Sequence, residues 1–388
     1  MIMSRRYVLG AVCAGNGAVE ATARRLSSLQ HSLQHRGFTS TPQRKANITH
    51  FTPTSSPALD SLLNDIRTKI ILPAYLPMSQ RKKIYSPKWE KKLQSDPIII
   101  EIDGEVLKFR YQNIMTDVPN TRKSLVDAIS QFETPADFAN LKPLLEGVHY
   151  AGRKLRHAFH AKILRVVGAK GHVYAIIDCA RGVLRTGYKL DSSEKVNEVL
   201  HYVQMKARDA GWDEAETRQA LRWAEMVIDM LHDEAHQPQR HKDESILPGE
   251  MPLTRDPMVL AAPLHLAAVL VARRKAGEET LDKVHKLARD IVALWPEDKK
   301  LKELQPSQLY ANMDKLGYLL RPTKFVAIAT PLLHGLETAV KVVKPELASQ
   351  LQTRCDTLAA EIKAAREAIQ PRKEDARAEV VYKKFYDA

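Results

Sequence analysis

The sequence predicts a mainly α-helical protein of stacked antiparallel helix pairs, in a bundle or an irregular α-solenoid, with one small β-hairpin near residues 98–111. From residue 119 onward, apolar residues recur at helical spacing, and short connections with Gly, Pro or capping residues separate the periodic segments. The clearest β pattern is a pair of apolar runs joined by Asp103-Gly104, a dipeptide that favours a two-residue hairpin turn. These observations together predict helices that lie side by side.

The first 38 residues have the composition of a mitochondrial transit peptide. Up to residue 49 the single acidic residue is Glu20, whereas arginine, serine, threonine and alanine are frequent. The inside-negative potential of the inner membrane draws such a positive segment inward, by about 2.3 kcal/mol per charge per 100 mV. The tripeptide Arg36-Gly37-Phe38 resembles the junction that matrix processing peptidases cut. We therefore expect residues 1–38 to be removed and the protein to reside in the mitochondrial matrix. A disordered basic tail is the alternative.

Composition divides the rest of the chain into six segments. A linker rich in Ser, Thr and Pro comes first, and an N-terminal extension follows, with a helix from Pro57, a basic segment and the hairpin. A helical domain, a Pro-rich linker, a second helical domain and a charged tail complete the chain. The expected ranges are 39–56, 57–118, 119–235, 236–257, 258–370 and 371–388.

Apolar periodicity predicts a series of helices in the two helical domains. Their ends are marked by Gly, Pro and capping residues such as Asp213, which forms a near capping box with Glu216. The most apolar stretch, Met258 to Ala272, is too short to span a membrane, so we expect no transmembrane segment. The predicted helices lie near 121–132, 136–150, 153–167, 172–187, 192–210, 213–235, 257–276, 278–294, 306–318, 322–342 and 345–369.

The chain is strongly basic. Its formal net charge is +13, and the leader, with five arginines and one glutamate, accounts for +4, so that the mature chain carries about +9. This excess favours polyanionic partners, which are RNA, mitochondrial DNA or an anionic membrane surface. After the leader, Cys179 and Cys355 stand alone, which excludes a zinc ribbon or a disulfide scaffold.

The first candidate RNA-binding segment lies at 81–92, where basic side chains alternate with aromatic ones. Lysine and arginine can neutralise phosphates while a tyrosine or a tryptophan stacks on a base. A solvated basic loop, whose aromatic residues anchor it to the core, is the alternative. The candidate residues are Arg81, Lys82, Lys83, Tyr85, Lys88, Trp89, Lys91 and Lys92.

The second candidate segment lies at 153–170, and no acidic residue occurs between Glu146 and Asp178. In the helix predicted at 153–167, the residues 153, 156, 157 and 160 share one face and would form a cationic ridge. A solvated helix face without a polyanion is the alternative. The candidate residues are Arg153, Lys154, Arg156, His157, His160, Arg165 and Lys170.

Three further motifs have competing interpretations. Gly168-Ala-Lys-Gly171 resembles the G-x-x-G loop of KH domains, but a turn between two helices explains the same residues, and no strands are predicted nearby. His232 and His236 have metal-ligand spacing, yet an aspartate occupies the place of the zincin glutamate, so that we expect polar surface. The segment 173–211 resembles one pentatricopeptide unit without a tandem neighbour.

No nucleotide-binding loop or catalytic motif stands out, so we expect no enzyme activity, no cofactor, no metal and no small-molecule substrate. The import signal, the basic mature chain, the many helices and the Arg36-Gly37-Phe38 junction together resemble the mitochondrion-specific proteins of the fungal mitochondrial ribosome. This resemblance implies a structural component, expected in the large subunit, that supports mitochondrial translation. It would contact rRNA through basic segments and neighbouring ribosomal proteins through helical faces. The alternatives are a helical-repeat RNA-processing or translation factor and a matrix assembly factor.

Overall fold

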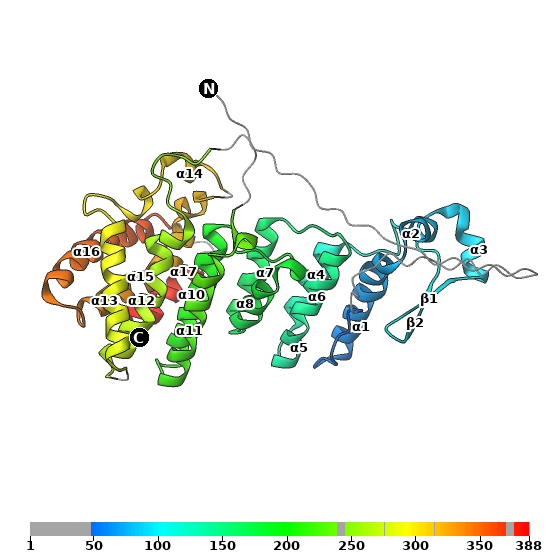
Figure 1. Ribbon diagram of the computed structural model, residues 1–388, viewed down its shortest axis with the longest axis horizontal. Coiled ribbons are helices and arrows are strands. Elements are labelled where there is room, and N and C mark those ends of the chain that lie inside the picture. The colour runs from blue at the N-terminus through cyan, green and yellow to red at the C-terminus, as the bar shows by residue number, and fades with distance from the viewer. Residues whose placement is uncertain (1–47, 239–244, 275, 314, 370–375, 388) are drawn as a thin grey trace, which may run out of the picture. The chain divides into compact units, whose positions relative to one another are not determined.

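The computed structural model describes residues 48–238, 245–274, 276–313, 315–369 and 376–387 (Figure 1). The predicted transit peptide and its junction lie outside the described residues. Residues Asn47–Ala388 form one compact unit. Its described part is mainly α-helical and contains one two-stranded sheet, which confirms the predicted fold class.

An amphipathic helix opens the helical part of the chain. α1 (Pro57–Ile66) has proline in its first turn, where no intrahelical donor is lost, and buries Leu59, Leu63 and Ile66. A π-helical turn and a 3₁₀ turn extend α1, and the basic segment then forms two short helices joined by another 3₁₀ turn. These elements are Arg67–Ile71, Leu72–Tyr75, α2 (Met78–Ile84), Pro87–Trp89 and α3 (Glu90–Ser95).

The predicted hairpin is confirmed. β1 (Ile98–Ile102) pairs antiparallel with β2 (Glu105–Phe109), with Ile98 opposite Phe109 and Ile102 opposite Glu105. Asp103 and Gly104 between the strands have φ values of 52° and 81°. Two positive φ values are what a type I′ turn requires, and this turn matches the twist of the two strands.

Residues 48–56 are held against the helices, although the sequence predicts a linker there. Ser55 donates from its N–H and from its hydroxyl to the Asp137 carboxylate, each at 2.8 Å. The N–H of Thr52 donates to Asn140 Oδ1 at 2.8 Å, and the Asn140 amide donates back to the Thr52 carbonyl at 3.0 Å. Because these bonds satisfy backbone groups, the segment is part of the folded unit.

The helices from α4 to α11 follow the hairpin and lie beside one another (Figure 1). Two predicted helices are each divided, because Asn140 separates α5 from α6 and Gly182 separates α8 from α9. α9 ends at Gly187, whose φ of 67° lies in the left-handed region that favours glycine. The bounds are α4 (Thr121–Gln131), α5 (Pro135–Ala139), α6 (Leu141–Tyr150), α7 (His157–Ala169), α8 (Val173–Arg181), α9 (Val183–Thr186), α10 (Ser193–Asp209) and α11 (Glu214–Met230).

The later helices are organised around α12. It packs on α10, α11, α13 and α15, and each residue from Pro257 to Leu270 is buried (Figure 1). A helix that is covered on all sides needs no polar face, which explains why this stretch is so apolar. The bounds are α12 (Pro257–Ala272), α13 (Glu278–Leu294), α14 (Ser307–Ala311), α15 (Pro322–Val340) and α16 (Pro345–Glu367), with short 3₁₀ turns at Glu234–His236, Leu253–Arg255, Leu301–Glu303 and Gly317–Leu320.

The predicted charged tail contains one more helix, α17 (Ala376–Tyr386), which packs on α15. Val381 and Phe385 are buried on the side that faces the other helices. The prediction of a charged tail is therefore wrong for this part. Helices from both sides of residues 236–257 are in contact, since α10 packs on α12 and α15, while the division into two helical domains stays a prediction. None of the described helices is long and apolar enough to cross a membrane.

Candidate nucleic-acid interface

The first predicted basic segment and the start of the second approach each other at the end of α2. The rings of Tyr75, just before α2, and Tyr150, at the end of α6, lie 4.5 Å apart. Burial raises the pKa of the half-buried Tyr85, while the charges of Arg153 and Arg81 lower it. Arg153 therefore lies close to the end of α2, although 68 to 72 residues separate the two sites in the chain.

Helices α2 and α3 are anchored by apolar side chains and present their lysines outward. Ile84 and Leu93 are buried. Lys83 Nζ lies 4.7 Å and Lys92 Nζ 5.5 Å from the centre of the half-buried Trp89 ring, so both ammonium groups interact with its π face. In the described part of the chain, the exposed lysines of this segment that have no hydrogen-bond or ion-pair partner are Lys82, Lys88 and Lys91.

Arg81 is used inside the protein instead. Its guanidinium donates to the carbonyl oxygens of Ala74 at 3.2 Å and of Leu76 at 3.5 Å. These carbonyls belong to the turn before α2, where no helical partner is available to them. Of the basic residues predicted at 81–92, Arg81 thus stabilises the entrance to its own helix.

Arg153, Lys154 and Arg156 do not form the predicted ridge, because α7 begins at His157. Gly152, with a φ of 71°, ends α6, and Arg153 donates its N–H back to the Val148 carbonyl at 3.2 Å. This is the hydrogen-bond pattern with which a glycine commonly terminates a helix. The three cationic side chains lie in the connecting loop, where they are exposed and have no hydrogen-bond or ion-pair partner within the described ranges.

The histidines of α7 contribute little positive charge. His160 is buried against the Tyr188 ring, at 5.0 Å between ring centres. Its pKa is lowered to about 4, first by burial and then by the nearby Lys195 charge, so the ring is neutral at physiological pH. The prediction that His160 belongs to a cationic ridge is wrong. The exposed His157 has its Nδ1 3.4 Å from Asp191 Oδ1.

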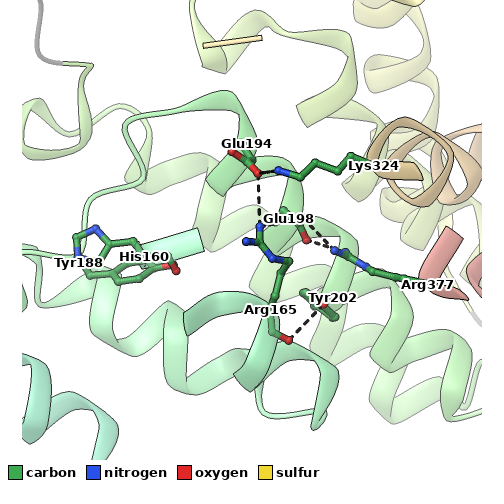
Figure 2. Close-up of polar contacts among 8 residues, drawn as sticks. All are labelled: His160, Arg165, Tyr188, Glu194, Glu198, Tyr202, Lys324 and Arg377. Carbon is green, nitrogen blue, oxygen red and sulfur yellow. Dashed lines mark hydrogen bonds and ion pairs between the residues drawn. The ribbon is translucent and has the colours of Figure 1, made fainter. Parts of the chain in front are cut away.

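Arg165 and Lys170 are also paired within the protein. Arg165 Nη1 lies 3.5 Å from Glu194 and 3.8 Å from Glu198, both on α10 (Figure 2). Lys170 donates to the carbonyl oxygens of Ser130 and Phe132, at 2.7 and 2.6 Å, and so caps the end of α4. Since these two cations are paired within the protein, they are not available to bind an external anion.

Glu194 and Glu198 hold three other helices to α10. Besides Arg165 of α7, Glu194 pairs with Lys324 of α15, and Glu198 pairs with Arg377 of α17 (Figure 2). Glu198 is fully buried, so its carboxylate needs partners that satisfy both oxygens. Some basic residues therefore form ion pairs with α10. Others, on α2, α3 and the 153–156 loop, are exposed and unpaired among the described residues.

Packing explains two of the other motifs. A Cβ on Gly168 would lie 2.4 Å from the Tyr202 ring, and Gly171 ends α7 with a φ of 80°. The G-x-x-G segment is therefore a turn between α7 and α8, and the strands among the described residues are the distant β1 and β2. His236 is buried and accepts a hydrogen bond from the Leu190 N–H at 3.0 Å, so the expectation of polar surface is wrong for it.

Sequence reasoning missed three residues beside the loop at 153–156. Lys189, in the segment after α9, and Lys195, in the first turn of α10, line the same cavity as Arg153, and so does His149 of α6. No spacing rule connects 149, 153, 189 and 195, because a turn at Gly187 brings them together. The described residues contain no group of three or more His, Cys, Asp or Glu that could hold a metal ion.

Comparison with known proteins decides the family. A family model described as "Mitochondrial ribosomal protein mS27" matches residues 36–386. The chain belongs to the mS27 family. The small ribosomal subunit protein mS27 of Neurospora crassa is 39% identical over 349 residues, which cover 86% of this chain and 88% of the relative.

Membership of the mS27 family identifies a structural mitochondrial ribosomal protein, a component of a ribonucleoprotein that serves mitochondrial translation, and not an enzyme. These points confirm the expectations from sequence. The expected large subunit is wrong, because the Neurospora mS27 protein is named as a small-subunit protein. Nothing in the basic segments distinguishes the two subunits, since both are built on phosphate-rich rRNA.

Proposed function

We propose that this chain is a structural protein of the small subunit of the mitochondrial ribosome, located in the matrix, and that it contacts rRNA through the basic residues of α2, α3 and the 153–156 loop. We call this the α2–α7 basic surface. It consists of Lys82, Lys83, Lys88, Trp89, Lys91, Lys92, Arg153, Lys154 and Arg156.

The observation that carries the proposal is the contrast between paired and unpaired cations. Arg81, Arg165 and Lys170 are engaged by carbonyls or carboxylates of the protein. Lys82, Lys88 and Lys91 and the three cations of the 153–156 loop are exposed, and their side chains have no such partner among the described residues. Like charges gathered on one surface repel one another, and phosphate groups would relieve this repulsion.

Trp89 adds a flat apolar ring to this surface. Lys83 and Lys92 keep their ammonium groups near the ring, where they can also reach a phosphate. A single-stranded rRNA segment could stack a base on the tryptophan while its backbone follows the lysines. Neighbouring ribosomal proteins would contact exposed faces of the other helices.

The test is gradient sedimentation of the tagged full chain, combined with cross-linking of the bound RNA. We expect the protein to sediment with the small subunit and to cross-link to its rRNA through peptides of 82–92 and 153–156. A protein that stays at the top of the gradient in moderate salt, or sediments with the large subunit, contradicts the proposal.

Charge-matched variants test the surface itself. The triple substitution of Lys82, Lys88 and Lys91 by Gln should weaken RNA binding. It should also reduce the slope of log affinity against log salt, by about 0.7 to 0.9 for each phosphate that the variant no longer neutralises. The control replaces the exposed Lys286, Arg289 and Lys363, on α13 and α16, by Gln. Equal losses of affinity in both variants would mean that net charge, and not this surface, binds the RNA.

The matrix location rests on the basic leader, and the family match begins at residue 36, beside the predicted junction. N-terminal sequencing of the mature protein tests it. We expect Thr39 as the first residue, and an intact Met1 would contradict removal of the leader.

A further inference from the structure

A cavity of about 350 Å³ opens beside the α2–α7 basic surface. Its walls come from the end of α6, the 153–156 loop, the start of α7, the segment after α9 and the start of α10. Most of the polar side chains that line it are basic. They are His149, Arg153, Lys154, His157, His160, Lys189 and Lys195, with Asp191 as the one acid among them.

The single carboxylate does not balance the cations. Asp191 forms an ion pair with the buried Lys195 and lies 3.4 Å from His157 Nδ1. Burial raises its pKa, but the hydrogen bond from His157 and the charge and hydrogen bond of Lys195 lower it to about 2. Asp191 is therefore ionised and already engaged.

The remaining cations of the cavity have nothing to neutralise them. The side chains of Arg153, Lys154 and Lys189 have no hydrogen-bond or ion-pair partner in the ranges that the structure describes. Three positive charges line one hollow, and no carboxylate among the described residues pairs with them. A concentration of one sign of charge in a cleft attracts and holds an ion of the other sign.

The start of α7 strengthens this field. Its N-cap, Arg156, provides no side-chain hydrogen bond to the first helical turn, and His157, the first helical residue, lines the cavity. The positive end of a helix of 13 residues therefore lies at the wall of the hollow. The partial positive charge of the helix end adds to the charge of the cationic side chains that line the cavity.

We propose that this cavity binds a phosphate group, held by Arg153, Lys154 and Lys189. A guanidinium binds two phosphate oxygens at once, and ammonium groups bind the third. The volume is in the range of ligand cavities and admits a phosphate with part of a sugar. The phosphate comes either from an RNA backbone, in which case the inference rests on the proposed function, or from a free phosphate compound.

The experiment uses the full chain, with inorganic pyrophosphate and a single-stranded RNA oligonucleotide without terminal phosphates as probes, and calorimetry at low salt as the readout. The cavity variant carries Arg153→Gln and Lys189→Gln. The control variant carries Lys88→Gln and Lys91→Gln, which removes the same charge from the surface outside the cavity. Circular dichroism confirms that both variants are folded.

We expect the cavity variant to bind pyrophosphate about tenfold more weakly than the wild type, and the control variant to bind it within about twofold. Competition of the oligonucleotide with pyrophosphate identifies an RNA backbone phosphate as the natural occupant. Pyrophosphate binding without competition identifies a free phosphate compound. Both outcomes support the cavity.

Absence of pyrophosphate binding to the wild type overturns the inference, and so does an equal loss of affinity in the two variants. A second readout follows His160 by NMR, because an anion in the cavity should raise the low pKa of this buried ring. If the wild-type protein binds pyrophosphate but gives no cross-links to rRNA, the proposed function is contradicted and the phosphate site in the cavity is still supported.

Discussion

Arg377, in the last helix of the chain, binds the buried carboxylate of Glu198 with two hydrogen bonds, Nη1 to Oε1 at 3.0 Å and Nη2 to Oε2 at 2.6 Å (Figure 2). The guanidinium also lies 5.1 Å from the centre of the Tyr202 ring. A paired geometry of this kind is the one in which a guanidinium matches a carboxylate best. It fastens α17 to α10 across the interior of the unit.

Arg377→Ala should lower the free energy of unfolding by about 3 kcal/mol, because it leaves the Glu198 charge buried with only the more distant Arg165 beside it. Urea denaturation measures this. The double variant with Glu198→Gln should recover part of the loss, since a neutral amide is easier to bury than a charge. Additive losses in the two single variants would contradict the pairing.

Gly168→Ala tests whether this glycine serves packing. The added methyl would lie 2.4 Å from the Tyr202 ring, so we expect a destabilisation of about 1–3 kcal/mol. A second substitution, Tyr202→Leu, should relieve the clash. Gly171→Ala, where no atom lies within 4 Å and the cost is the positive φ, is the comparison and should lose about 1 kcal/mol. A stable Gly168→Ala protein with impaired RNA binding would favour the KH interpretation.

Stability should fall on mild acidification because of a buried histidine pair. His265 Nδ1 lies 2.8 Å from Gln204 Oε1, and its Nε2 lies 2.8 Å from His334 Nδ1. Burial lowers the pKa of His334 to about 4 and that of His265 well below the usual value. Unfolded histidine takes up a proton near pH 6.5, so below that pH the unfolded state binds protons that the folded state excludes.

The free energy of unfolding therefore decreases as the pH falls from about 6.5 to 4, by about 1.4 kcal/mol per pH unit for each such histidine. Urea denaturation at pH 7 and pH 5 measures the decrease, which should be smaller by about 2 kcal/mol in His334→Gln. Asp256, whose pKa burial raises to about 6, acts in the opposite direction but is common to both proteins. An identical decrease in the variant would show that His334 is not the proton-linked group.

Trp89→Ala should weaken binding to single-stranded RNA by about tenfold, which corresponds to the loss of one stacked base. Trp89→Phe, which keeps an aromatic face, should bind within a few-fold of the wild type. Fluorescence anisotropy with a labelled oligonucleotide measures both. Unchanged affinity of Trp89→Ala would mean that the ring serves to order Lys83 and Lys92 and does not touch RNA.

Local patterns in the sequence predicted the local elements well. The turn at Asp103-Gly104 and the cap at Asp213, whose carboxylate accepts from the N–H groups of Ala215 and Glu216, are recognised within four residues. The uniform apolarity of α12 is likewise typical of a buried helix. In each case the physical cause lies within one turn or one helix.

The candidate interface could be predicted only in part, because the partners of its residues are remote. Arg165 meets Glu194 from a position 29 residues away, and Lys170 reaches carbonyls near the end of α4. A basic residue looks the same in sequence whether it faces solvent or a carboxylate. Of the second basic segment, the unpaired arginine and lysine residues are therefore those of the 153–156 loop. The neighbouring Lys189 is brought to this loop by the fold, and no sequence pattern indicates it.

The docking of α17 has a consequence for the fate of truncated forms of the protein. Arg377 follows Glu198 by 179 residues, so the buried carboxylate of α10 depends on a partner that lies far along the chain. A premature stop codon between codons 230 and 377 would leave α10 and α11 complete but Glu198 without this guanidinium. Such a truncated product would carry an incompletely paired buried charge, and quality-control proteases would remove it faster than the full chain.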